Sequence, residues 1–339
     1  MFSFVIIQHI IVMIFEFTAR PHFDFITEFS QKYKIALNNN TLVIPDQMGE
    51  GFIRKVAFNE DFRLLMHRYN LKEDFTIIRN PSEVPNDLIS IFFYNNEQPI
   101  DLIYNSENPV KFSRKNDSAI QVTTSDLNSI IRFPANSETY YMVVGITAAK
   151  LSSLLGAENP NSIIKTITSG ISSFLYFESM SAEVQKVLKH ITSINMTDPL
   201  SNFHIQIKVQ ELLYHLFSAL SKRESVTQKT LSNSDVEKLM VVRNTILANL
   251  SVPPLLSSLA ATVAMSETKL KQLFRQTFGD SVYNYYQKIR MEEAAFLLKQ
   301  GNQSVSEIGY ELGFSNLSHF SRLFEKHYGI TPKKFTSTR

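Results

Sequence analysis

The stretch 251–335 constrains the fold most, because its apolar spacing and turn signals predict two short helix pairs joined by one long helix. Pro253 and Pro254 open the stretch, and proline is a signal that stops a preceding helix. A glycine follows four of the predicted helices, at Gly279, Gly301, Gly313 and Gly329. The C-terminal part of the chain is therefore predicted to be all-α.

The first predicted pair begins with a short amphipathic helix that carries Leu255, Leu256, Leu259, Ala260 and Val263. Ala264 and Met265 form a tight connection, and Ser266 is the expected N-cap of a second helix, 267–278. Its inward face is expected to hold Leu270, Leu273, Phe274 and Thr277. The other faces are expected to hold Thr268, Lys269, Lys271, Gln272, Arg275 and Gln276.

A long helix is predicted over 282–300, with a length of roughly 28 Å at ~1.5 Å per residue. The second pair starts with a capping box, Ser304 and Glu307, and Ser315 is the expected N-cap of its second helix, 316–328. The inward side chains of that helix are expected to be Phe320, Leu323, Phe324 and His327. The outward ones are expected to be Asn316, Ser318, His319, Arg322 and Lys326.

Two such helices on a rigid connector suit duplex DNA. A helix fits the major groove and reads base edges with Arg, Lys, Gln, Asn and Ser, while other basic groups hold phosphates. Two helices held apart could enter successive major-groove segments, roughly 34 Å apart on one face of the duplex. One chain could then read a long asymmetric site.

This segment resembles the DNA-binding domain of the AraC/XylS family of transcriptional regulators. The matching positions of the first half are Leu259, Ala260, Met265, Ser266, Leu270, Phe274, Gly279, Tyr285, Arg290, Ala294, Leu297 and Leu298. Those of the second half are Ile308, Gly313, Phe314, Ser318, Phe320, Arg322, Phe324, Gly329, Pro332 and Phe335. The sequence departs from the family pattern at Gly309, Leu317, Glu325 and Thr336.

The resemblance implies which side chains read bases. They are Thr268, Lys271 and Gln272 in the first recognition helix, and Leu317, Ser318 and Arg322 in the second. The exposed residues Lys269, Arg275, Asn316 and His319 complete the expected DNA-binding set. The alternative for each residue is a solvated helix face. Leu317 could make only apolar contact, for example with a thymine methyl group. Arg290 is expected to be structural and to pair with a neighbouring carboxylate.

The charge distribution agrees with this division of the chain. From Ser232 onward the net charge is +4, and the remainder carries −2, within a total of +2 over 339 residues. That length predicts two domains. The chain has no Cys, which excludes disulfides, thiolate metal sites and Cys nucleophiles and points to the cytoplasm.

The first 15 residues are strongly apolar, yet Gln8 and His9 interrupt the run and Glu16 ends it. A membrane span needs roughly 20 apolar residues, and no convincing cleavage site follows. The run is interpreted as a leading strand or helix, or as an extension ahead of a start at Met13. A signal peptide is the minor alternative.

Short β-rich runs separated by turns fill 41–147, at 41–44, 51–58, 62–69, 74–79, 88–94, 119–123, 130–133 and 139–146. They predict a small barrel or jelly roll. The resemblance makes it a cupin-like sensor domain with flanking helices, so the expected fold is α+β and multidomain. His67 is the lone histidine of this region, so no metal, cofactor or catalytic site is expected. The aromatic residues are interpreted mainly as core, and include Phe92, Phe93, Tyr94, Tyr140 and Tyr141.

Helices are predicted next at 148–155, 161–177, 182–194 and 203–222. The last carries an apolar stripe: Ile205, Val209, Leu212, Leu213, Leu216, Phe217 and Leu220. The stripe either packs on its own domain or forms a dimer helix, as AraC-like proteins often do. Residues 1–222 are thus the expected sensing and dimerisation domain, 223–234 a linker, and 235–339 the DNA-binding domain, opened by a helix over 236–250.

The sequence therefore predicts a cytoplasmic, sequence-specific regulator that binds double-stranded DNA and is not an enzyme. The expected partners are a small-molecule effector in the N-terminal domain, RNA polymerase and a second copy of the chain, with no membrane. Lys333, Lys334 and Arg339 would add attraction for phosphates. Two alternatives stay open: a constitutive regulator whose N-terminal domain binds a protein, and a cupin-type enzyme that carries a DNA-binding module.

Overall fold

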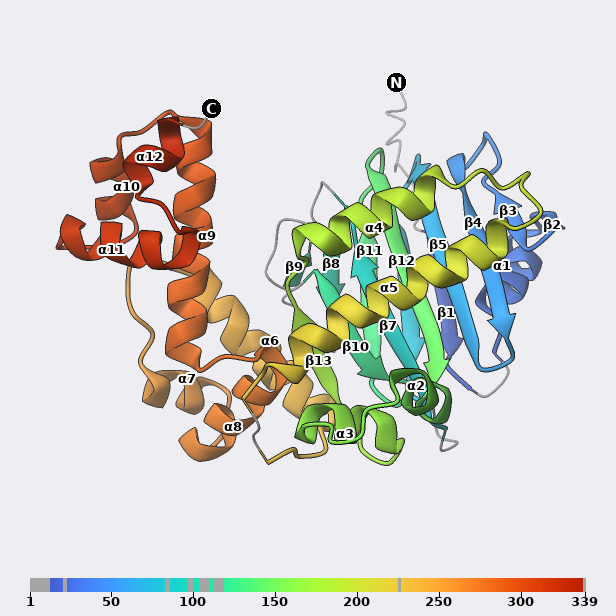
Figure 1. Ribbon diagram of the computed structural model, residues 1–339, viewed down its shortest axis with the longest axis horizontal. Helices are drawn as coiled ribbons and strands as arrows, with labels where there is room; N and C mark the ends of the chain where they lie inside the picture. The colour runs from blue at the N-terminus through green and yellow to red at the C-terminus, as the bar shows by residue number, and fades with distance from the viewer. Residues whose placement is uncertain are drawn as a thin grey trace, which may run out of the picture. The chain divides into compact units, whose positions relative to one another are not determined.

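The structure is a computed structural model, and it describes residues 13–20, 23–82, 86–96, 100–103, 110–112, 119–224 and 227–337 (Figure 1). The chain divides into two compact units, Met1–Glu237 and Lys238–Arg339. The first is rich in strands and the second is entirely helical where it is described. This confirms the predicted β-rich N-terminal part and all-α C-terminal part.

The strands of the first unit form two sheets. The five-stranded sheet has the order β1-β6-β11-β8-β9, and the eight-stranded sheet has the order β13-β10-β7-β12-β5-β4-β3-β2. The bounds are β1 Met13–Thr18, β2 Leu37–Asn38, β3 Thr41–Val43, β4 Gly49–Asn59, β5 Phe62–Leu71, β6 Phe75–Asn80, β7 Leu88–Tyr94, β8 Ile100–Ile103, β9 Val110–Phe112, β10 Ile120–Thr124, β11 Ser129–Phe133, β12 Glu138–Thr147 and β13 Leu175–Glu178.

The central strands β5, β7 and β12 have both faces covered. Because side chains alternate between the faces of a strand, one set enters a core with the helices: Phe62, Leu64, Met66, Ile89, Ile91, Phe93, Met142, Val144 and Ile146. The intervening set faces a pocket: Arg63, Leu65, His67, Leu88, Ser90, Phe92, Tyr141, Val143 and Gly145. Two buried faces explain the consecutive apolar residues of β7 and β12.

The helices of the first unit are α1 Phe25–Tyr33, α2 Ala148–Leu155, α3 Ser162–Ser169, α4 Ala182–Ser193 and α5 Ser201–Ser221. Helices α4 and α5 lie across the eight-stranded sheet in Figure 1, and their apolar residues join its core. The stripe of α5 foreseen from the sequence is buried in that core. Of the two interpretations left open for this stripe, packing within its own domain is the observed one.

The closed cupin-like barrel is not confirmed, because within the described residues the two sheets have free ends and do not close. All eight predicted strand positions match described strands within about two residues at each end. The small strands β2, β8, β9 and β13 and the helix α1 had not been predicted.

The prediction of one helix over 161–177 is wrong. The helix α3 ends at Ser169, and Gly170 follows it in the left-handed region with φ 65°. The chain then returns as β13, in which Leu175 to Glu178 pair antiparallel with β10. Pairing with a neighbouring strand, a non-local contact, overrides the helical spacing of the local sequence.

The apolar N-terminal run is described only from Met13. Residues 13–18 form β1, which pairs in parallel with β6, so this end of the run is a strand as one of the alternatives held. Residues 1–12 lie outside the described part of the chain. A search of the described helices for one long and apolar enough to cross a bilayer found none.

The described part of the expected linker packs against the first unit. The side chain of Leu231 is buried, and its amide donates to Ser173 O. Tyr176 Oη donates to Gln228 at 2.8 Å. Helix α6 then spans Asn233–Ala248, three residues earlier at its start than predicted.

The second unit holds α7 Leu256–Thr262, α8 Glu267–Phe278, α9 Val282–Gln300, α10 Val305–Glu311, α11 Leu317–Tyr328 and α12 Pro332–Ser337. Figure 1 shows α7 and α8 at one end of α9, and α10, α11 and α12 at the other. The bounds of α8 and α9 equal the predicted ones. The two helix pairs and their long connector are therefore confirmed as elements.

Candidate nucleic-acid interface

The first helix pair is set by two local features. Ala264 adopts φ 47°, so the chain turns sharply between α7 and α8. Ser266 then caps α8, where its Oγ accepts from the amide of Lys269 at 3.3 Å. Gly279 ends the helix in the left-handed region with φ 83°. Local capping therefore fixes both ends of α8.

Helix α8 divides into two faces. Leu270, Leu273 and Phe274 are buried, while Thr268, Lys269 and Lys271 are exposed and Gln272 and Arg275 are half-buried. The predicted outward position of Gln276 is wrong, because this side chain is fully buried. The reason is that the buried face of α8 continues around its last turn.

The second helix pair starts with the predicted capping box. Glu307 Oε2 accepts from the Ser304 amide at 2.7 Å, and Ser304 Oγ accepts from the Glu307 amide at 3.2 Å. The bond from the Ser304 backbone is the main reason that the pKa of Glu307 lies below its usual value.

The N-cap of α11 is Asn316 and not Ser315 as predicted. Asn316 Oδ1 accepts from the amide of His319 at 3.1 Å, and Asn316 has the extended backbone of a cap, with φ −125°. Both residue types suit the position, so the sequence alone did not discriminate between neighbours. One of the expected DNA-binding residues therefore also holds the start of its own helix.

The outward face of α11 carries Ser318, His319 and Arg322, all exposed. Arg322 Nε lies 3.4 Å from Ser318 O, one turn earlier on the same helix. The predicted inward position of His327 is wrong, since this side chain is exposed. The buried residues of α11 are Phe320 and Phe324 only, so the stripe that faces the unit is narrower than predicted.

Leu317 differs from the other expected base-reading residues of α11, Ser318 and Arg322, which are exposed. It is half-buried, and a Cβ added to Gly309 would come within 2.6 Å of Leu317 Cδ2. Leu317 thus occupies the space that the missing methyl group of Gly309 leaves open. Two departures from the family pattern, separate in the sequence, meet at one contact between α10 and α11.

Arg290 connects α9 to the turn between α10 and α11. The prediction that it is structural agrees with its burial, but the predicted carboxylate partner is wrong. Its guanidinium donates to Leu312 O and to Gln287 Oε1, and lies 3.7 Å from the centre of the Phe314 ring. Burial lowers the pKa of Arg290 below its usual value. A carbonyl at the end of α10 and an aromatic face take the place of the expected anion.

Two further hydrogen bonds join the helices of this unit, and neither was predicted from the sequence. Arg243 of α6 is buried, and its Nε donates to Tyr285 Oη at 2.8 Å. Tyr286 Oη donates to Leu250 O at 3.0 Å. A charged residue at a buried helical position is the signal that could have identified Arg243.

The exposed faces of α8 and α11 are rich in donors. Lys271 of α8 forms an ion pair with Glu267 at 4.0 Å, and both side chains are at least half exposed. Such a pair contributes little and is readily exchanged for a phosphate. With 19 residues, α9 spans roughly 28 Å between the helix pairs, close to the ~34 Å that separates successive major-groove segments.

A search of the described residues for three or more His, Cys, Asp or Glu side chains that could hold a metal ion found none. The first unit contains a pocket between its two sheets, in which Phe92 and Tyr141 line the wall while Phe93 belongs to the core. The sequence analysis assigned no pocket residues, yet Arg63 and Arg79, charged residues inside apolar strands, were a usable signal.

Known proteins similar to this chain match it mainly in the helical second unit. Residues 259–338 match the family described as "Helix-turn-helix domain". An uncharacterised HTH-type transcriptional regulator of Haemophilus influenzae is 35% identical over 80 residues, which are 24% of this chain and 27% of that protein. The HTH-type transcriptional activator CfaD of Escherichia coli is 31% identical over 157 residues, 46% of this chain and 56% of that protein.

A solved structure of a transcriptional regulator from Chromobacterium violaceum, described as AraC-type DNA-binding domain-containing, is 31% identical and covers 31% of this chain and 95% of its own, with a TM-score of 0.29. The chain spans about a quarter of the length of the first curated relative and just over half of the second. Residues 259–338 of this chain form a helix-turn-helix domain of the AraC type.

Proposed function

We propose that this protein is a sequence-specific DNA-binding transcriptional regulator that reads two neighbouring major-groove segments with α8 and α11. One observation carries the proposal: two donor-rich, exposed helix faces are held at the two ends of a single rigid helix, α9. The assignments of base contact are Thr268, Lys271 and Gln272 on α8, and Ser318 and Arg322 on α11. Lys269, Arg275, Asn316 and His319 are assigned to phosphates or to positioning.

The test is selection of random duplex DNA by the purified full chain. The selection is repeated with Lys271→Ala/Gln272→Ala and with Arg322→Ala. A site with two elements about one helical turn apart is expected, each element degraded by its own variant. Lys189→Ala and Arg132→Ala remove the same charges from exposed positions of the first unit and should leave the site unchanged. Binding that is blind to sequence in every protein would overturn the proposal.

We propose that a small molecule binds to the first unit and controls DNA binding by the second. The support is a pocket between the two sheets, with a cavity volume of about 90 Å³ and a mainly apolar and aromatic lining. A ligand there would touch strands of both sheets, so its binding can change how they pack. In this proposal the protein regulates transcription in the cytoplasm, where it binds DNA and RNA polymerase. It catalyses no reaction.

We also propose that the protein forms a homodimer through the exposed face of α5, opposite its buried stripe. Phe203, Ile207 and Tyr214 are 61%, 46% and 67% exposed, and their spacing places them on one side of the helix with Leu200. Apolar residues at such spacing suit pairing with a second α5. Sedimentation of Phe203→Glu/Ile207→Glu should show a monomer, and an unchanged dimer mass would refute this interface.

A further inference from the structure

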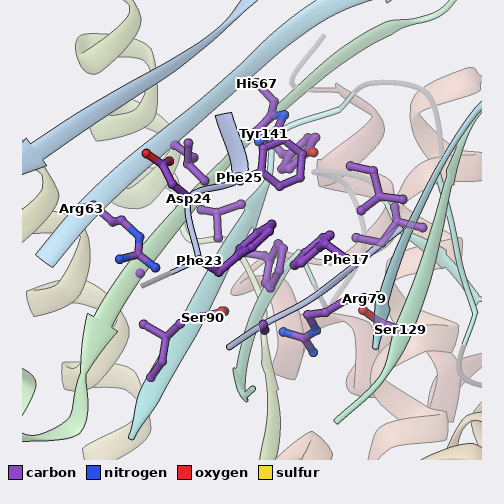
Figure 2. A pocket seen from close by; sticks show the side chains of 18 of the residues that line it. Phe17, Phe23, Asp24, Phe25, Arg63, His67, Arg79, Ser90, Ser129 and Tyr141 are labelled. Carbon is purple, nitrogen blue, oxygen red and sulfur yellow. The ribbon is translucent and has the colours of Figure 1, made fainter. Parts of the chain in front are cut away.

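The pocket of the first unit lies between the facing sides of the two sheets. One wall comes from β5, β7 and β12, and the other from β1, β6 and β11. The lining is completed by Lys55 of β4 and by Ala19, Phe23, Asp24 and Phe25. Figure 2 shows aromatic side chains at its centre, with Phe17 and Phe23 side by side. Their rings are stacked 4.5 Å apart. Most of the surface that a ligand would meet is therefore apolar.

The apolar lining also contains four charged residues: Asp24, Lys55, Arg63 and Arg79. Lys55 Nζ and Asp24 Oδ2 form an ion pair at 2.8 Å, which neutralises both. His67 is almost fully buried, and burial lowers its pKa to about 3, so the ring is neutral at ordinary pH. Arg79 is 4% exposed and lies 6.0 Å from the centre of the Phe92 ring.

Arg63 is the exception. Its half-buried guanidinium lines the pocket, and it has neither a hydrogen bond nor an ion pair with any residue that the structure describes. Burial lowers its pKa, and the charge of nearby Asp24 opposes that shift. Its guanidinium carries five N–H donors that no described residue accepts, so these donors can be given to an anion that enters the pocket.

The strand opposite makes room for this side chain. Gly145 of β12 pairs with Arg63 of β5, and a Cβ at Gly145 would lie 3.3 Å from Arg63 Nε. Because glycine lacks that carbon, the Arg63 side chain can lie flat over the strand. Figure 2 shows Arg63 and Arg79 on either side of the central aromatic rings. His67 also lines the pocket, and its Nδ1 is buried without a hydrogen bond to any described atom.

We propose that this pocket binds an organic carboxylate with an apolar body, whose carboxylate group is held by Arg63. The planar guanidinium can donate two parallel hydrogen bonds to a carboxylate, and the aromatic rings cover the apolar body. The role of this ligand as the effector rests on the proposed function, whereas its binding does not.

Binding is tested by calorimetry on the full chain in the absence of DNA. The probes are octanoate and 4-phenylbutyrate, each compared with the alcohol of the same skeleton, octan-1-ol and 4-phenylbutan-1-ol. At least one carboxylate should bind, and more tightly than its alcohol. Arg63→Gln should weaken that carboxylate about 10-fold to 100-fold, the range for a lost charged hydrogen bond, and leave the alcohol unchanged.

Two further variants control the result. Arg132→Gln removes an exposed arginine that points away from the pocket and should not alter binding. Ser90→Phe adds bulk to the lining and should weaken carboxylate and alcohol alike, which decides the location even if Arg63→Gln does not fold. The proposal is overturned if no carboxylate binds better than its alcohol, or if folded Arg63→Gln binds as tightly as the native chain.

The effector role is measured separately, as the change in affinity for the selected DNA when the carboxylate is added. Carboxylate binding without any change in DNA affinity would leave the pocket assignment standing and remove the effector role. Failure to select a DNA site would count against the proposed function alone, because the calorimetric experiment contains no DNA.

Discussion

Replacing Gly313 by alanine should destabilise the second unit far more than the same change at Gly329. Both glycines follow a helix and adopt the left-handed region, with φ 79° and φ 73°. Each alanine therefore costs about 1–2 kcal/mol for the backbone conformation alone. At Gly329 nothing lies within 4 Å of the added Cβ, so that cost should be the whole effect.

At Gly313 the added Cβ would lie 1.9 Å from Ser251 O and 2.6 Å from Ser251 C. These are backbone atoms, so no side chain can rotate away, and the turn between α10 and α11 has to move. An overpacked site typically costs a further 1–3 kcal/mol. We expect a total near ~4 kcal/mol for Gly313→Ala, which exceeds Gly329→Ala by about 2 kcal/mol or more.

Hydrogen exchange of the full chain gives a readout specific to this unit, which matters because the chain has no Trp and two separate units. Backbone amides of α11 should exchange at least ~30-fold faster in Gly313→Ala than in Gly329→Ala, from the difference of about 2 kcal/mol. Equal exchange in the two variants would show that the approach of Ser251 to the turn does not constrain the unit.

Three other changes test other contacts. Arg290→Lys should destabilise the second unit by about 2 kcal/mol, because an ammonium cannot both stack on Phe314 and keep the forked hydrogen bonds; an unchanged melting temperature would contradict this. Ser304→Ala should cost ~1 kcal/mol in the same assay through loss of the cap, and no loss would contradict the capping box. Folding lowers the pKa of His67 from 6.5 to about 3. Between pH 6.5 and pH 3 the unfolded chain therefore binds a proton at His67 and the folded chain does not. The stability of the first unit should fall as the pH drops through this range, by up to ~1.4 kcal/mol per pH unit. Urea titrations at pH 7 and pH 5 should show the fall, and His67→Gln should show less of it; equal slopes in both proteins would refute the assignment.

The helices of the second unit were predictable because their ends are set by nearby residues. Ser266 and Gly279 bound α8, and Gly301 ends α9, so residues a few positions apart decide where each helix starts and stops. The same local reasoning failed where two neighbours offered equal chemistry, as with Ser315 and Asn316. It failed again for His327, whose exposure depends on how many turns of α11 the rest of the unit covers.

The first unit was predictable in content but not in arrangement. Short β-rich runs bounded by turn residues located β5, β7 and β12. The local sequence of β13, by contrast, predicts a helix, and only its pairing with β10 makes it a strand. The prediction of a small barrel or jelly roll came from the short strands and turns, and the family resemblance made it cupin-like. Strand pairing is a non-local property that such a local pattern cannot settle. The same holds for the pocket, whose lining comes from seven strands, the first residue of α1 and residues just before it.

The sequence by itself determined the class of each unit, the helix pairs, their connector and the donor-rich helix faces, because capping, periodicity and turn residues act over a few positions. Only the tertiary structure decided that Leu317 fills the space beside Gly309 and that Arg290 binds a carbonyl and a ring. It alone also decided that Arg63 lines an apolar pocket without a hydrogen bond to any described residue. These facts join residues far apart in the chain, or depend on which surfaces are withdrawn from water, and the energy of a charged or apolar side chain follows from those surroundings.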